Sequence, residues 1–194
     1  MPTRNTQFAK GNYYHIYNRG VGRQGIFLED EHYRFALRLM KQYAAENQIA
    51  VIAYCLMPNH YHWLVRQDGD KPAGLLAQRV FNSYTKALNR QLERTGTLFE
   101  TRYKSKSIER DEYLRHLCRY IHANPVIGGV VNTLLEWPYS NIHEWLGQRA
   151  GTLCDRTFLQ ELFPDSARYL QFVQDYIVYR QMPDELAAYI EQIK

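Results

Sequence analysis

The chain has 194 residues, of which 45% are hydrophobic, 14% aromatic and 23% charged. This composition excludes a disordered chain and provides enough apolar side chains for one globular core. No apolar run reaches the ~18–20 residues of a membrane span, and residues 1–20 contain no apolar signal segment. The three cysteines are scattered, which favours reduced, buried thiols over disulfides or a zinc knot. We therefore expect a cytoplasmic protein without membrane contact.

The formal charge of +4 is unevenly distributed along the chain. Residues 1–130 contain 19 basic and 11 acidic residues, whereas residues 131–194 contain 5 and 9. The first part is basic enough to favour a polyanionic partner, and the second part is acidic.

Apolar patterning and breaker residues predict the elements in chain order. Strands are expected at 12–18, 49–56, 60–66 and 98–108, and helices at 31–46, 74–94 and 111–124. The order strand, helix, hairpin, helix, strand predicts an α+β protein with a ferredoxin-like antiparallel sheet and two helices on one face. The pattern of residues 137–194 predicts a tail of short helices.

Two histidines two residues apart are the first candidate functional group. His60 and His62 lie on one strand, so their imidazoles project from the same face of the sheet. Such a pair can hold one divalent cation, although an exposed pair without function has the same spacing. The other histidines (His15, His32, His116, His122 and His143) lack a partner at ligand spacing and are expected to be packing or surface residues.

The helix predicted at 111–124 carries a second candidate pair. Tyr120 and Asn124 are four residues apart and lie at the margin of its apolar stripe, where side chains contact both core and ligand. The Asn124 carbonyl oxygen suits a hard cation. The alternative is that Tyr120 packs and Asn124 ends the helix before Pro125.

Basic residues gather in two segments that also contain aromatic residues. Arg102, Lys104 and Lys106 share one face of the strand predicted at 98–108, and Arg19 and Arg23 lie in the loop after the first strand. Alternating cations and aromatic rings suit single-stranded nucleic acid, which they bind by stacking and phosphate contacts. A solvated strand face is the alternative.

Five segments, in this order, resemble the REP-associated tyrosine transposases, a branch of the HUH (His-hydrophobe-His) superfamily of single-strand transposases. They are YHIYNRG at 14–20, MPNHYHWLV at 57–65, GTLFETRY at 96–103, YIHANPV at 120–126 and WPYSN at 137–141. The resemblance divides the chain into a catalytic domain at 1–130 and a helical C-terminal extension at 131–194.

The resemblance implies specific roles for residues of this chain. His60, His62 and Asn124 match metal ligands for Mg²⁺ or Mn²⁺, and Tyr120 matches a nucleophile that forms a 5′-phosphotyrosine intermediate. The implied partner is single-stranded DNA with a hairpin structure, such as a REP-like palindrome, bound by a monomer or homodimer. The DNA-binding candidates are then Asn18, Arg19, Arg23, Arg102, Lys104 and Lys106.

The residues alone leave two other functions open. A ferredoxin-like sheet with aromatic and basic residues is also the platform of a non-catalytic RRM-like nucleic-acid-binding module. A metal nuclease that activates water, with Tyr120 only structural, would cleave DNA without forming a covalent adduct. The acidic tail could also dock over the cleft as a mimic of DNA.

Overall fold

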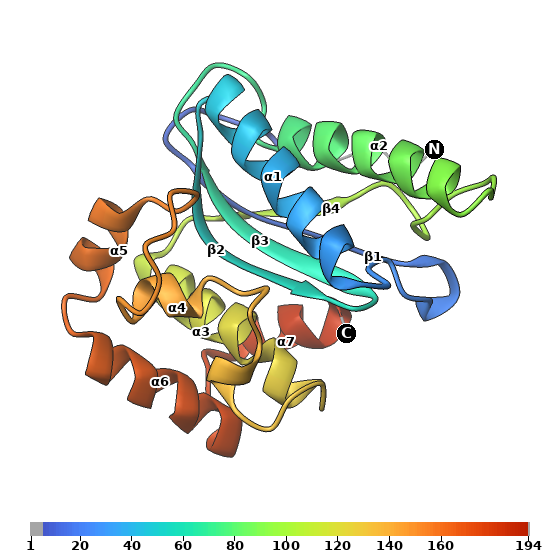
Figure 1. The fold of residues 1–194 in the computed structure, drawn as a ribbon. Coiled ribbons are helices and arrows are strands. Elements are labelled where there is room, and N and C mark those ends of the chain that lie inside the picture. Colours follow the sequence, from blue (N-terminus) through green and yellow to red (C-terminus); the bar gives the residue numbers. More distant parts are fainter. Residues whose placement is uncertain (1–5, 194) are drawn as a thin grey trace.

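The computed structural model describes residues 6–193 and has the predicted α+β architecture (Figure 1). The four strands are β1 (Tyr13–Arg19), β2 (Ile49–Met57), β3 (His60–Gln67) and β4 (Lys104–Ile108). They form one antiparallel sheet in the order β2-β3-β1-β4. The helices α1 (Asp30–Glu46) and α2 (Gly74–Gln91) connect them in the ferredoxin-like order. The predicted fold class is therefore confirmed.

Alternation along β3 sends its side chains to two different environments. Tyr61 and Trp63 point toward α2. The centroid of the Phe81 ring lies 4.3 Å from that of Tyr61 and 5.2 Å from that of Trp63. Both residues are buried, as expected when one face of a strand is covered by helices. His60 and His62 therefore project from the opposite face, away from α1 and α2.

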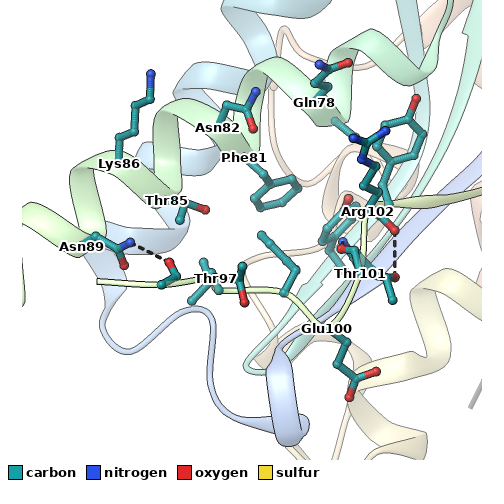
Figure 2. Close-up of a pocket in the computed structure, with 17 residues that line it drawn as sticks. Gln78, Phe81, Asn82, Thr85, Lys86, Asn89, Thr97, Glu100, Thr101 and Arg102 are labelled. Atoms are coloured by element: carbon teal, nitrogen blue, oxygen red, sulfur yellow. Dashed lines mark hydrogen bonds between the residues drawn. The ribbon is translucent and has the colours of Figure 1, made fainter. Parts of the chain in front are cut away.

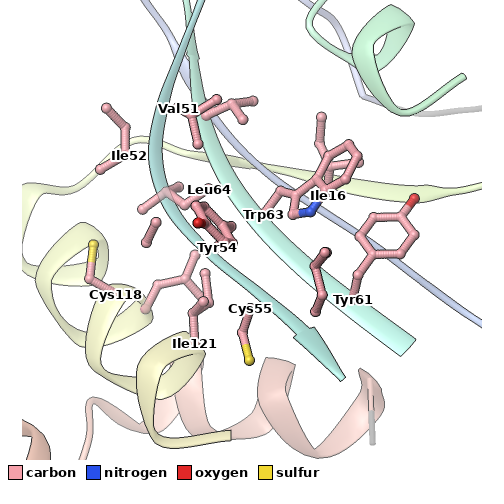
Figure 3. Packing of buried hydrophobic residues seen from close by; sticks show 14 of the residues in the cluster. Ile16, Val51, Ile52, Tyr54, Cys55, Tyr61, Trp63, Leu64, Cys118 and Ile121 are labelled. Carbon is pink, nitrogen blue, oxygen red and sulfur yellow. The ribbon is translucent and has the colours of Figure 1, made fainter. Parts of the chain in front are cut away.

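The opposite face of the sheet is covered by α3 (Asp111–Ile127). Figure 3 shows Cys118 and Ile121 of α3 among the buried side chains of β2 and β3. Cys55, Cys118 and Cys154 are all free and buried, as predicted, and burial raises the pKa of each thiol.

Several predicted boundaries differ from the structure. The helix predicted at 74–94 ends at Gln91, and two other differences have a clear physical cause. The helix expected to end at 124 continues through Pro125 to Ile127, because the Gly128 N–H donates to the Asn124 carbonyl at 2.7 Å and closes a further turn. The strand expected at 98–108 is interrupted. Phe99 pairs with Gly20 and β4 begins only at Lys104, since Tyr103 between them turns inward and packs beside Gly74.

The chain after α3 returns twice to the sheet. Its helices are α4 (Ile142–Trp145), α5 (Arg156–Leu162), α6 (Ser166–Tyr179) and α7 (Asp184–Ile193). Residues 139–141 run beside β2, with the Leu56 N–H donating to the Tyr139 carbonyl at 2.9 Å and the Asn141 amide donating to the Ile52 carbonyl at 2.8 Å. Then α7 lies on the same face of the sheet as α3 (Figure 1). No helix within residues 6–193 is long and apolar enough to cross a membrane.

A buried histidine of α3 makes the stability of the fold depend on pH. His122 lies 2.5 Å from the Tyr169 hydroxyl through Nδ1 and 2.9 Å from Asn141 Oδ1 through Nε2. Burial lowers its pKa from 6.5 to about 4. Because the unfolded chain takes up this proton first, the stabilisation is complete above pH ~6.5 and decreases as the pH falls toward 4.

We expect the free energy of unfolding of the wild type to fall more steeply between pH 6.5 and 4 than that of His122→Gln. The difference should reach up to about 3 kcal/mol, and urea unfolding at stepped pH measures it. Parallel pH dependences in the two proteins would contradict the assignment.

Candidate active site

Four side chains from two distant segments meet on the covered face of the sheet. His60 and His62 come from β3, and their ring centroids lie 5.1 Å apart. Tyr120 and Asn124 come from one face of α3, since they are separated by about one helical turn. The Tyr120 ring lies 5.4 Å from His62, and Asn124 Oδ1 lies 3.5 Å from His60 Nε2. The structure thus brings together the four residues predicted as catalytic and metal-binding, all from one chain.

Neighbouring amides fix how His60 and Asn124 face each other. Asn59 Nδ2 donates to the Arg23 carbonyl, which turns Asn59 Oδ1 toward His60 Nδ1 at 2.7 Å. The proton of His60 therefore resides on Nδ1 and Nε2 carries a lone pair. Asn124 Nδ2 donates to the Tyr120 carbonyl at 2.9 Å, so that Oδ1 faces His60. Two acceptors consequently face each other, which is the arrangement that a shared cation stabilises.

His62 is held by a histidine that the sequence analysis assigned to packing or the surface. His15 Nε2 lies 3.0 Å from His62 Nδ1, and His15 Nδ1 lies 2.7 Å from the Tyr189 hydroxyl of α7. When His62 Nδ1–H donates to His15 and His15 Nδ1–H donates to Tyr189, the lone pair of His62 is on Nε2. His15 is buried, as a packing residue would be, and its partner lies at no ligand spacing in the sequence, because β1 pairs beside β3 and places the two rings on one face.

Burial keeps the imidazoles of the site uncharged. It lowers the pKa of His60 to about 4, against a smaller opposing effect of Asn124, whose oxygen would accept a hydrogen bond from the protonated ring. It also lowers the pKa of His62 well below its ordinary value, with the charges of His15 and His60 acting in the same direction. Neutral imidazoles are the form that ligates a metal.

Tyr120 is enclosed, with only 3% of its surface exposed. Burial raises the pKa of its hydroxyl above 10, and hydrogen bonding with Asn124 acts in the opposite direction. A phenol with a raised pKa is a weak nucleophile until a nearby positive charge or a base favours loss of its proton. A nucleophilic role for Tyr120 would therefore require such an activating group in the site.

The donor set fits a divalent cation of the Mg²⁺ or Mn²⁺ type. His60 Nε2, His62 Nε2 and Asn124 Oδ1 provide two nitrogen atoms and one oxygen atom, all neutral. Within residues 6–193 no group of three or more His, Cys, Asp or Glu side chains is placed to hold a metal. A third protein donor beside the two imidazoles would therefore be the Asn124 carboxamide oxygen.

The C-terminal helix narrows the space in front of the histidines. His60 and His62 open onto a cavity of only about 80 Å³, which Gln192 and Ile193 of α7 help to line. The Arg19 guanidinium donates to the Ile193 carbonyl at 3.1 Å, and the Lys106 ammonium lies 4.0 Å from the centroid of the Tyr189 ring. Since small-ligand pockets usually exceed ~300 Å³, a nucleotide does not fit while α7 is docked.

The predicted DNA-binding residues fall into three places. Lys104 and Lys106 of β4 lie on the face of the sheet that carries His60 and His62, because they are paired with Tyr17 and His15 of β1. Arg19 is opposite His60 in the register of β1 and β3. Asn18 donates to the Thr101 carbonyl at 3.0 Å and lies between two cavities. The remaining two lie outside this face: Arg102 lines a separate cavity beside α2, and Arg23 lies in the turn after β1.

The contact between His15 and His62 has a measurable consequence for metal binding. We expect His15→Ala to weaken Mn²⁺ binding by about 10- to 100-fold, as partners of metal-ligating histidines typically do. His15→Gln should recover part of the affinity, because its amide can accept from His62 and donate to Tyr189. Titration calorimetry with Mn²⁺ measures both variants, and His143→Ala serves as the control. Equal affinities in His15→Ala and wild type would exclude this positioning role.

The ferredoxin-like sheet with a His-x-His pair beneath a tyrosine-bearing helix is the arrangement expected from the resemblance to single-strand tyrosine transposases. Residues 9–124, which include all four site residues, match the family described as "Transposase IS200 like". The chain belongs to this family of IS200-like transposases.

One curated protein is similar to this chain in sequence, and one solved structure is similar to it in fold. A Haemophilus influenzae protein assigned as a REP-associated tyrosine transposase is 27% identical over 113 residues, which are 53% of this chain. The match covers 64% of that relative, so the chain spans less than two thirds of its length. The solved structure of a REP-associated tyrosine transposase bound to a REP hairpin has a TM-score of 0.66 at 18% identity. It covers 80% of this chain and 94% of the other, and it has the same fold.

Proposed function

We propose that this protein is a metal-dependent tyrosine endonuclease and strand transferase that acts on single-stranded DNA hairpins. The observation that carries the proposal is the convergence of Tyr120 of α3 with His60 and His62 of β3, with Asn124 one turn beyond the tyrosine. A nucleophile beside a set of neutral metal ligands is what cleavage of a phosphodiester requires.

The metal would be Mg²⁺ or Mn²⁺, held by His60, His62 and Asn124. When bound, it supplies positive charge that stabilises the oxygens of the phosphate in the transition state. Asn59 and His15 serve this set by fixing the protonation of the two imidazoles.

Tyr120 would perform the chemical step. Its hydroxyl oxygen forms a bond to phosphorus while the bond from phosphorus to the 3′ oxygen breaks, which leaves a 5′-phosphotyrosine and a free 3′-hydroxyl. The phenol loses one proton and the departing oxygen gains one. One phosphodiester replaces another, so the step is reversible and a 3′-hydroxyl of a second strand can be joined without ATP.

We infer the substrate class from the basic residues near the histidines and from the DNA that a protein of similar fold binds. Lys104 lines the histidine cavity and Lys106 is on the same face, and residues 1–130 are basic overall. Such a surface favours phosphate groups. The structural relative binds a REP hairpin. We therefore extend the proposal to REP-like palindromes as the substrate and to a monomer or homodimer as the acting form.

Incubation with end-labelled single-stranded hairpin DNA and Mn²⁺ tests the proposal. We expect a protein–DNA adduct that survives denaturing electrophoresis and that does not form in EDTA. DNA binding that is insensitive to EDTA and gives no cleavage would instead indicate an RRM-like binding module. Cleavage to a free 5′-phosphate without adduct would indicate a nuclease that uses water.

A further inference from the structure

A second cavity lies on the other side of the segment that borders the histidines. It has a volume of about 730 Å³ and opens between α2 and residues 96–103 (Figure 2). Asn18, Glu100 and Thr101 line both this cavity and the one at His60 and His62. The two spaces are therefore neighbours that share one wall. No residue of α7 lines the larger space, so it is accessible while α7 covers the histidines.

The lining of this cavity combines aromatic rings with side-chain amides. Phe81 points into it from α2 (Figure 2), and the Phe99 ring lies 4.9 Å from Phe81 between centroids at an interplanar angle of 73°. Along α2, Gln78, Asn82 and Asn89 add three carboxamides. Asn89 Oδ1 is buried and has no hydrogen-bond partner among residues 6–193. An apolar surface with amides placed around it is the chemistry that binds a flat heterocycle with polar edges.

The charged residues of the lining lie at the edges of the cavity. Glu100 stands on the shared wall, and its carboxylate points away from Phe81 (Figure 2). Lys86 and Arg102 are exposed lining residues, placed where a backbone could pass. The volume lies within the ~300–1,000 Å³ that enclose small ligands.

We propose that the cavity between α2 and residues 96–103 binds an unpaired nucleobase of the DNA strand whose phosphate enters the histidine site. The inference rests on the proposed function for the identity of the strand, because the shared wall lets one strand occupy both spaces. Carboxamides form paired hydrogen bonds with adenine, so the cavity selects a base as well as holding it. It thus contributes sequence preference outside the reacting centre.

Binding measurements in EDTA test the cavity separately from cleavage. Fluorescence anisotropy with labelled oligo-dA, oligo-dC and oligo-dT should show that the wild type prefers oligo-dA. The double variant Gln78→Ala/Asn82→Ala should bind oligo-dA about 10-fold more weakly and lose the preference among the three. Gln42→Ala, an exposed amide on α1 outside both cavities, should bind as the wild type does. Unchanged affinities and preference in the double variant would overturn the proposal.

Photocrosslinking provides a second measurement that needs no variant. Wild-type protein irradiated with an oligo-dA that carries the photoreactive adenine analogue 8-azidodeoxyadenosine should yield crosslinks in peptides containing Phe81 or Phe99. Crosslinks confined to other segments would also overturn the proposal. The adduct assay with Mn²⁺ distinguishes the two failures. An adduct without involvement of the cavity refutes only this inference, whereas involvement of the cavity without any adduct refutes only the cleavage mechanism.

Discussion

Replacing Tyr120 by phenylalanine is expected to abolish the covalent protein–DNA adduct, with a loss of at least ~10³-fold in the rate of its formation. Removal of a nucleophile typically has effects of this size or larger. The change deletes one oxygen atom and leaves the ring beside His62, so the packing of α3 should persist. Denaturing electrophoresis of the reaction with labelled hairpin DNA and Mn²⁺ measures the result.

The neighbouring tyrosine of α6 is a matched control for this experiment. Tyr176 is also buried, and its ring lies 6.4 Å from that of Tyr120. Tyr176→Phe should form the adduct, and Tyr120→Phe should still bind DNA in EDTA as the wild type does. If Tyr120→Phe formed the adduct and Tyr176→Phe did not, Tyr176 and not Tyr120 would be the nucleophile.

Removing residues 181–194 is expected to increase the rate of adduct formation by about 10-fold or more. These residues include α7, which contacts Arg19 and Lys106 and leaves only about 80 Å³ in front of the histidines. DNA must displace the helix to enter, and a docking preference of ~1.4 kcal/mol already corresponds to a factor of ten. Single-turnover adduct assays measure the change.

The position at which the chain is truncated and two point variants make the test of α7 more specific. Deletion from 137 onward would also remove Tyr139 and Asn141, which hydrogen-bond to β2, so the truncation has to begin after α6. Leu186→Asp places a charge on the buried face of α7, whereas Ala188→Asp adds the same charge on its exposed face. Only the first should mimic the truncation. Wild-type rates in both the truncated protein and Leu186→Asp would show that α7 does not obstruct the site.

The sequence was sufficient to predict the sheet and two pairs of side chains for physical reasons, whereas the union of the two pairs in one site was implied by the resemblance to the tyrosine transposases. A period of two placed His60 and His62 on one face, and helical spacing placed Tyr120 and Asn124 on one side of α3. Tertiary contacts determined the element boundaries that the sequence did not predict. The alternation around residue 103 gave no sign that Tyr103 would turn inward and interrupt the strand, and Pro125 wrongly indicated the end of a helix.

Two further features do not follow from the sequence because they depend on contacts between segments far apart in the chain. His15 and Tyr17 share one face of β1, a pattern visible in the sequence, but only the neighbouring position of β3 brings His15 to His62. The acidity of the segment that contains α7 predicts its docking only through charge. In the structure Leu186, Tyr189, Ile190 and Ile193 of α7 are buried, and net charge does not reveal such contacts.

The packing of α3 determines where a strand end would be after cleavage. The helix is fixed on one side by β2 and on the other by α6, and Tyr120 projects from its middle. A DNA end joined to this residue would be held beside the sheet, because α3 packs on β2 and on α6. The acceptor strand would then have to reach this 5′ end at the surface of the sheet, so the path of the second strand would be set by the packing of a single helix.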